Sequence, residues 1–116
     1  MSLSQMVVGA KDAAAGRGLQ EIANRNLDFG RVRSLKLDSQ ARRIEVELDL
    51  HGESEAVHVV IEDYRLGESP EGLTITAGKI TTSRQWLTVL AQRFVVGRPW
   101  TLPMQPAAQL LVTRLI

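Results

Sequence analysis

Cysteine is absent from this sequence of 116 residues. Its absence excludes disulfide bonds, thiolate nucleophiles and cysteine-ligated metals, so the fold depends on an apolar core. Long apolar runs are also missing, because none approaches the roughly 20 residues that a membrane-spanning helix needs. No basic N-terminal stretch leads into an apolar segment, as it does in a secretory signal. We therefore expect a soluble protein with the cytoplasm as default compartment, although a signal segment already removed would leave no trace.

Charge of one sign is not in excess, since the formal net charge is +1. Such a chain has no strong long-range field toward a phosphate backbone, and nucleic acid is not an expected partner. Lysine is scarce: only Lys11, Lys36 and Lys79 are present, and the other basic residues are arginines. Guanidinium groups suit carboxylate pairs, protein interfaces and anionic head groups alike. Composition leaves these three roles open.

Hydrophobic residues make up 44% and charged residues 23% of the chain, the usual mixture of a globular protein. This length fits one domain with one core, which we expect to span residues 1–116. The predicted fold class is α+β. It comprises an N-terminal helix, a four-stranded curved antiparallel β-meander, a second helix packed on the sheet, and a short helical or extended C-terminal tail.

The first predicted helix runs from about Leu3 to Arg25. A capping box at Ser2 and Gln5 opens it, and apolar residues follow at helical spacing. Gly16 and Gly18 each cost about 1 kcal/mol relative to alanine inside a helix. We interpret them, with their small neighbours, as a smooth face that lies close against a sheet. The other members of this face are Gly9, Ala13, Ala14 and Ala15.

Strict alternation from Ile44 to Leu50 predicts a strand with one buried and one solvated face. Residues 31–37 and 57–64 are predicted to flank it as two hairpins. In the first hairpin Leu37 pairs with Ile44, which makes the opposed charges complementary. In the second, Leu50 pairs with Val57. That register places Asp49 opposite His58, but also Glu45 opposite Glu62, an unfavourable pair.

A loop over residues 67–72 and a fourth strand from Leu73 to Ile80 are predicted next. Two phase slips, at Val32 and at Gly78, indicate bulges and a strongly curved sheet.

Thr82 and Gln85 then form a capping box for a second helix that ends near Gly97. Its wide apolar face suggests that it is covered on two sides. Residues 98–103 are expected to be extended, and Pro106 to begin a last short helix. We expect the terminal Leu115-Ile116 to dock into the core.

Arginines and tryptophans bracket the second helix, and aromatic rings beside guanidinium groups suit anionic amphiphiles, membrane interfaces or protein hot spots. Of the two interpretations, we favour the one in which both tryptophans anchor the core. The candidate ligand- or partner-binding residues are Arg84, Trp86, Leu90, Phe94, Arg98 and Trp100.

Catalytic and metal-binding patterns are weak. The glycines between Gly9 and Gly18 lack the spacing of a phosphate-binding loop. His51 and His58 do not define a shared metal geometry. The carboxylates of the central strands recur at strand period, as on a solvated face, with no cleft implied. We predict no catalytic residue, metal or cofactor, and an enzyme is not favoured.

In the order of its elements, the stretch from about Asn26 to Pro103 resembles single-unit relatives of amphiphile-binding proteins, in which a sheet wraps a long helix. The resemblance implies an apolar or lipid-like ligand. The leading hypothesis is a non-catalytic binding or assembly module that holds such a ligand, or a partner segment, between the sheet and the second helix. A structural homo-oligomer subunit is the alternative. A small enzyme with an acidic and histidine site on the sheet face is third.

Overall fold

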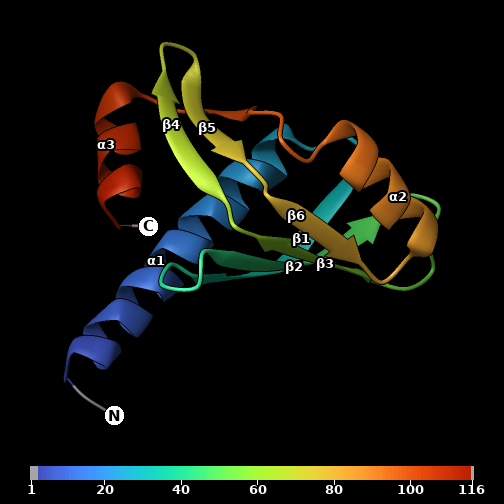
Figure 1. Cartoon of the computed structure of the whole chain (residues 1–116), viewed down its shortest axis with the longest axis horizontal. Helices are drawn as coiled ribbons and strands as arrows, with labels where there is room; N and C mark the ends of the chain where they lie inside the picture. Colours follow the sequence, from blue (N-terminus) through green and yellow to red (C-terminus); the bar gives the residue numbers. More distant parts are fainter. Residues whose placement is uncertain (1–2, 116) are drawn as a thin grey trace.

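The computed structural model describes the backbone of residues 3–115 and the side chains of residues 9–25, 27–110 and 112–114. It confirms the α+β class (Figure 1). The elements in chain order are α1 (Leu3–Asn26), β1 (Gly30–Asp38), β2 (Arg43–Leu50), β3 (Val57–Glu62), β4 (Arg65–Ser69), β5 (Gly72–Thr76), β6 (Lys79–Thr82), α2 (Gln85–Phe94), β7 (Trp100–Pro103) and α3 (Pro106–Leu115). The predicted Ser2–Gln5 cap and the docking of Leu115-Ile116 lie outside the described residues.

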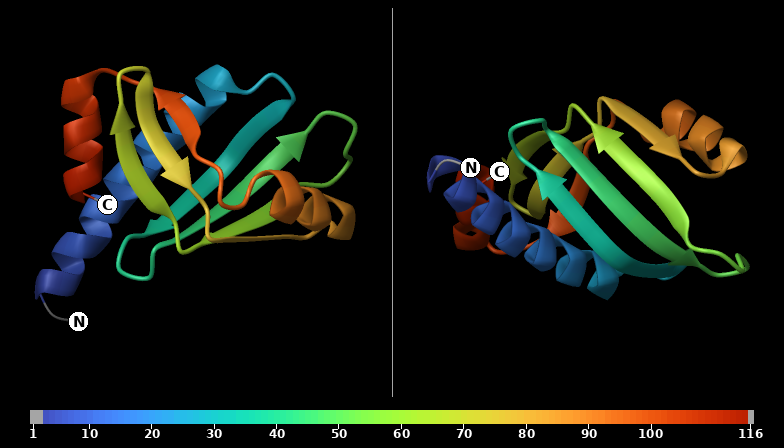
Figure 2. Two further views of the ribbon diagram at one scale, coloured as in Figure 1. Left: turned by 45° about the horizontal axis from the view of Figure 1, so that its top comes forward. Right: turned by 90° about the horizontal axis from the view of Figure 1, so that it is seen from below.

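Two antiparallel sheets pack beside α1. The larger has the strand order β1-β2-β3-β6, and the smaller has the order β4-β5-β7. Leu19 of α1 and Leu73 of β5 form the centre of the main core, which joins α1, both sheets and α3. Figure 2 shows α1 running along the β1 side of the larger sheet, with the smaller sheet and α3 on its other flank.

Only part of the expected smooth face of α1 touches the sheet. A Cβ atom on Gly16 would lie 3.3 Å from the carbonyl oxygen of Leu35, so glycine permits close approach there. Gly9 and Gly18 have open space around them. Ala13 and Ala14 are exposed. The prediction is therefore confirmed at Gly16 and wrong for these four positions.

The first hairpin is confirmed in register. Leu37 lies opposite Ile44, and Asp38 lies opposite Arg43. The register shifts between Val32 and Ser34, which is the bulge predicted from the phase slip of Val32. The apolar faces and the complementary charges of these two strands favour the same register. The local sequence pattern was therefore sufficient to predict it.

The predicted register of the second hairpin is wrong by two residues. Leu48, rather than Leu50, lies opposite Val57. A shift of two keeps the same side chains on the apolar face, so alternation alone does not distinguish the two registers. The observed register places Arg43 opposite Glu62 and removes the opposed glutamates. It also places His58 opposite Glu47 instead of Asp49.

The predicted loop over residues 67–72 is a hairpin. Ser69 pairs with Gly72, so β4 and β5 are joined by a two-residue turn. The predicted fourth strand is in fact two strands: β5 belongs to the smaller sheet and β6 to the larger, with Ala77 and Gly78 between them. The phase slip at Gly78 therefore marks the point where the chain passes from one sheet to the other, and not a bulge.

The second helix packs on β6 and on apolar side chains of β3, with Ala91 buried against Ala77 and Ile80. The hydroxyl of Thr82 accepts a hydrogen bond from the Arg84 N–H (3.1 Å), but Gln85 does not complete the predicted capping box. Gly97 (φ +80°) follows the helix end as predicted. The extended segment and the helix beginning at Pro106 are also confirmed, as β7 and α3.

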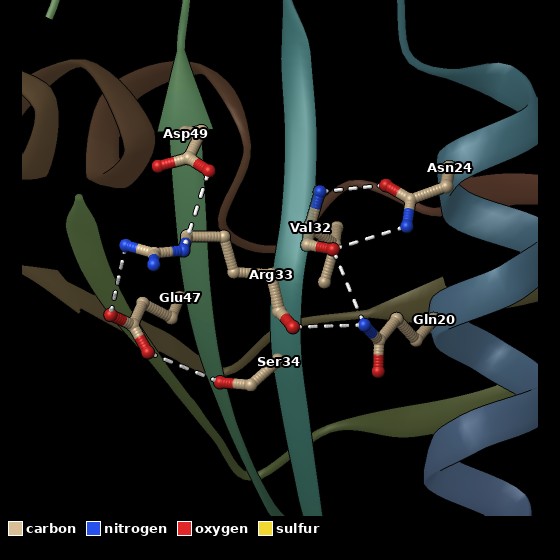
Figure 3. A network of polar contacts seen from close by, with 7 residues as sticks. All are labelled: Gln20, Asn24, Val32, Arg33, Ser34, Glu47 and Asp49. Atoms are coloured by element: carbon tan, nitrogen blue, oxygen red, sulfur yellow. Dashed lines mark hydrogen bonds and ion pairs between the residues drawn. The ribbon is translucent and has the colours of Figure 1, made fainter.

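Side chains from the helices occupy the edges of the sheets. The Asn24 amide oxygen accepts from the Val32 N–H (2.6 Å), and its nitrogen donates to the Val32 carbonyl (3.1 Å) (Figure 3). Gln109 makes the same pair of bonds to Ser69, at 3.2 and 2.9 Å. Gln92 donates to the carbonyl of Ile80 (3.3 Å). The edges formed by β1, β4 and β6 are thus each capped by a different helix.

Candidate functional site

The outward side of α2 is apolar and uncovered. Trp86, Val89, Leu90 and Phe94 are 52%, 53%, 44% and 53% exposed. Their spacing spreads them over about 140° of the helix circumference, and the buried Ala91 lies outside this arc. We call these four residues the outer face of α2. In Figures 1 and 2, α2 lies at the periphery of the molecule with no other element on this side.

The expectation that α2 is covered on two sides is wrong, because β6 and β3 cover one side only. Trp86, Leu90 and Phe94 lie together as predicted. However, they point outward instead of being enclosed between sheet and helix. Trp100 is 56% exposed, so neither tryptophan anchors the core. A helix with so wide an apolar face normally has a second contact surface, and α2 lacks one within the described residues.

The predicted arginines take different positions. Arg84 directs its guanidinium toward Glu53 (3.7 Å) and Glu55 (3.8 Å) in the loop between β2 and β3. It ties the start of α2 to that loop and does not belong to the outer face. Arg98 and Trp100 follow α2, and Trp100 lies in β7 opposite Ile75. The structure therefore unites three of the six candidate residues on one surface.

Arg93 belongs to the exposed side of α2 but was not among the predicted residues. It follows Leu90 by three positions and Val89 by four, which makes it their neighbour on the helix surface. Arg93 and Arg98 are exposed, and neither forms an ion pair with any side chain that the structure describes. The outer face of α2 therefore has an unneutralised guanidinium beside its apolar side chains.

Acidic residues are distributed unevenly along the chain. All 13 lie at or before Glu71, so the sequence from Gly72 onward contains none. Five basic residues lie in that second part: Lys79, Arg84, Arg93, Arg98 and Arg114. The net charge of +1 for the whole chain does not reveal this asymmetry. A separate count for each part would have shown that the part from Gly72 onward carries only basic side chains.

No family model, curated protein or solved structure matches this chain. Its function must therefore be inferred from its own surfaces.

The carboxylates of the solvated sheet face are paired with arginines. Arg33 lies 3.4 Å from Asp49 and 3.9 Å from Glu47 (Figure 3), and Arg43 lies 2.8 Å from Glu45. Within residues 3–115, no three histidine, aspartate or glutamate side chains gather as a metal site. The observed register also separates His58 from Asp49. The hypothesis of an acidic and histidine site gains no support from this geometry.

Two of the hollows among the described residues lie beside buried polar or aromatic groups. One, of about 590 Å³, lies between α1 and β1 and includes Asp12, whose Oδ2 accepts from the Ser39 N–H (2.9 Å). The other, of about 680 Å³, lies where the chain passes between the sheets and includes Arg42 and Tyr64.

No helix among the described residues is both long and apolar enough to cross a membrane. Of the seven large apolar side chains that are exposed among the described residues, four belong to the outer face of α2.

Tyr64 provides a test of packing at the second hollow. Its ring is 1% exposed, and the Arg42 guanidinium lies 4.5 Å from the ring centre. Burial raises the pKa of Tyr64 above its ordinary value of about 10, and the nearby Arg42 charge offsets only part of this. Because the raised pKa belongs to the folded state, the contribution of the neutral Tyr64 side chain to the free energy of unfolding is complete below about pH 10. It is lost as the pH rises through the folded pKa.

Absorbance at 295 nm reports this residue alone, because Tyr64 is the only tyrosine. We expect tyrosinate to form at higher pH in the folded protein than in urea-unfolded protein. Superimposable titration curves would contradict the burial of Tyr64.

Proposed function

We propose that this protein is a non-catalytic module that binds a lipid surface through the outer face of α2. The observation that carries the proposal is the joint exposure of Trp86, Val89, Leu90 and Phe94 on one side of a folded helix. Amphipathic helices that lie in the membrane interface place tryptophan, phenylalanine and leucine at the boundary of head groups and acyl chains. Tryptophan also favours this boundary because its ring is apolar and its N–H is polar.

The available apolar area supports modest, reversible binding. Complete burial of a valine, leucine or phenylalanine side chain is worth about 1.5 to 3 kcal/mol. About half of each outer-face side chain is already covered, so the four together would gain roughly 4 kcal/mol on insertion. This is less than stable anchoring requires. The protein would therefore attach and detach rather than remain in the membrane.

A second copy of the chain is the competing occupant, as in a structural homo-oligomer. Pairing two outer faces about a twofold axis would bury each Arg93 against the α2 helix of the other copy. No acidic residue lies in α2 to pair with it. A guanidinium buried without a partner in an interface costs free energy, whereas a lipid surface imposes no such contact. Charge therefore favours the lipid surface.

Phe94→Ser tests the proposal. It should lower the partition coefficient on vesicles of phosphatidylcholine and phosphatidylglycerol about tenfold, because a half-buried aromatic side chain is lost. Phe29→Ser is the matched control, since Phe29 is the only other phenylalanine and is 58% exposed at the start of β1. The control should bind as the wild type does. Co-sedimentation measures binding, and in a Trp100→Phe background, where Trp86 is the one remaining tryptophan, a blue shift of its emission reports insertion.

Two results would contradict the proposal. The first is wild-type protein that sediments with no vesicle. The second is equal loss of binding in Phe94→Ser and Phe29→Ser. If light scattering instead shows a dimer that only Phe94→Ser dissociates, the outer face binds a second copy and the lipid proposal is wrong.

A further inference from the structure

We infer that the lipid surface is anionic and that Arg93 is the residue of α2 that contacts its phosphate groups. This inference rests on the proposed function. It adds a specificity that apolar side chains alone do not provide, since acyl chains are equally apolar in zwitterionic and anionic membranes.

The position of Arg93 is the first observation. On the helix surface it adjoins Val89 and Leu90, one turn earlier, and lies two turns from Trp86. An arginine with such neighbours can bury its methylene groups along apolar side chains and keep its guanidinium at head-group level. The planar guanidinium has donors that bind phosphate oxygens in pairs. Insertion of the outer face would therefore bring Arg93 to the phosphate layer.

The absence of competing carboxylates is the second observation. Arg93 and Arg98 form no ion pair among the described side chains. From Gly72 onward the sequence has no acidic residue that could neutralise them or repel an anionic surface. Glu53 and Glu55 are near the start of α2, where they share the single guanidinium of Arg84. The helix itself carries positive charge only, because Arg93 is the one charged residue of α2.

The binding difference between two vesicle types tests this inference. A basic residue near an anionic surface strengthens binding by about fivefold. With Arg93 close to the surface, wild-type protein should bind vesicles containing phosphatidylglycerol about fivefold more tightly than vesicles of phosphatidylcholine alone. Rising salt should reduce this preference, because mobile ions screen exposed charges.

Arg93→Gln should lose about fivefold on the anionic vesicles and retain its binding to phosphatidylcholine. Arg17→Gln is the matched control. Arg17 is also an exposed helical arginine without an ion pair among the described residues, but it lies in α1. It should behave as the wild type does. Arg93→Lys should restore most of the lost affinity, because the charge returns.

Equal binding of wild-type protein to both vesicle types would overturn the inference and leave the proposed function standing. Absence of binding to either type would overturn the proposed function, and the inference with it. A single-stranded oligonucleotide that binds as tightly as the anionic vesicles, with the same loss in Arg93→Gln, would identify nucleic acid as the partner and also overturn the inference. Inorganic phosphate should not compete with the vesicles, and effective competition at equal ionic strength would assign the site to a free anion.

Discussion

Replacing Gln109 by leucine is expected to lower the free energy of unfolding by about 3 kcal/mol. Gln109 is 2% exposed, and its amide bonds to the N–H and carbonyl of Ser69 and to the carbonyl of Met104. Leucine has nearly the same volume but supplies no polar group. The backbone of Ser69 would then be left without partners in the protein interior, at a cost of about 1 to 3 kcal/mol for each buried group.

Urea denaturation followed by circular dichroism measures this loss. Gln40→Leu is the control, because Gln40 is an exposed glutamine in the turn between β1 and β2. Its substitution should change stability by less than about 0.5 kcal/mol. Equal destabilisation by the two variants would show that the Gln109 amide does not hold α3 on the edge of β4.

Truncating Leu73 to alanine should cost about 2 to 5 kcal/mol. Leu73 is fully buried in β5 and packs with Leu19 at the point where α1, both sheets and α3 meet. The loss includes the transfer of the removed methyl groups and the cavity that remains among elements on several sides. Leu110→Ala is a matched comparison, since Leu110 is 48% exposed on α3. A Leu73→Ala variant no less stable than Leu110→Ala would contradict this location of the core.

The sequence predicted well those parts of the fold that depend on near neighbours. The first hairpin has a short turn, matching apolar faces and complementary charges, so its register and the bulge after Val32 follow from local rules. The start of α3 follows from the fixed backbone of Pro106. The second hairpin failed because its longer loop admits two registers with identical apolar faces.

Long-range pairing was the other part that local patterns did not reveal. The separation of β5 from β6 depends on β7, which pairs with β5 from about thirty positions along the chain. The same applies to Asn24 and Gln109, whose amides act as backbone substitutes at strand edges. Nothing in the spacing of either residue indicates its distant partner.

The candidate site was predicted in composition but not in position. Periodicity places Trp86, Leu90 and Phe94 on one side of a helix, and the structure agrees. Periodicity does not tell whether that side of the helix is buried against the sheet or exposed. That depends on how the helix is oriented on β6 and its neighbouring strands. Arg93 was missed because a single basic residue within an apolar helix is usually attributed to solvent exposure.

The amide caps on the sheets also determine how crowded copies of this protein would behave. Attachment to a two-dimensional surface raises local concentration, and open strand edges would then allow one molecule to template fibre growth from another. Asn24, Gln109 and Gln92 already occupy backbone groups on three of those edges. The fourth edge, β7, is bracketed by Pro99 and Pro103, which cannot donate backbone hydrogen bonds. At these positions a strand of a neighbouring molecule would meet side-chain amides or proline rings instead of free backbone donors, which hinders edge-to-edge pairing.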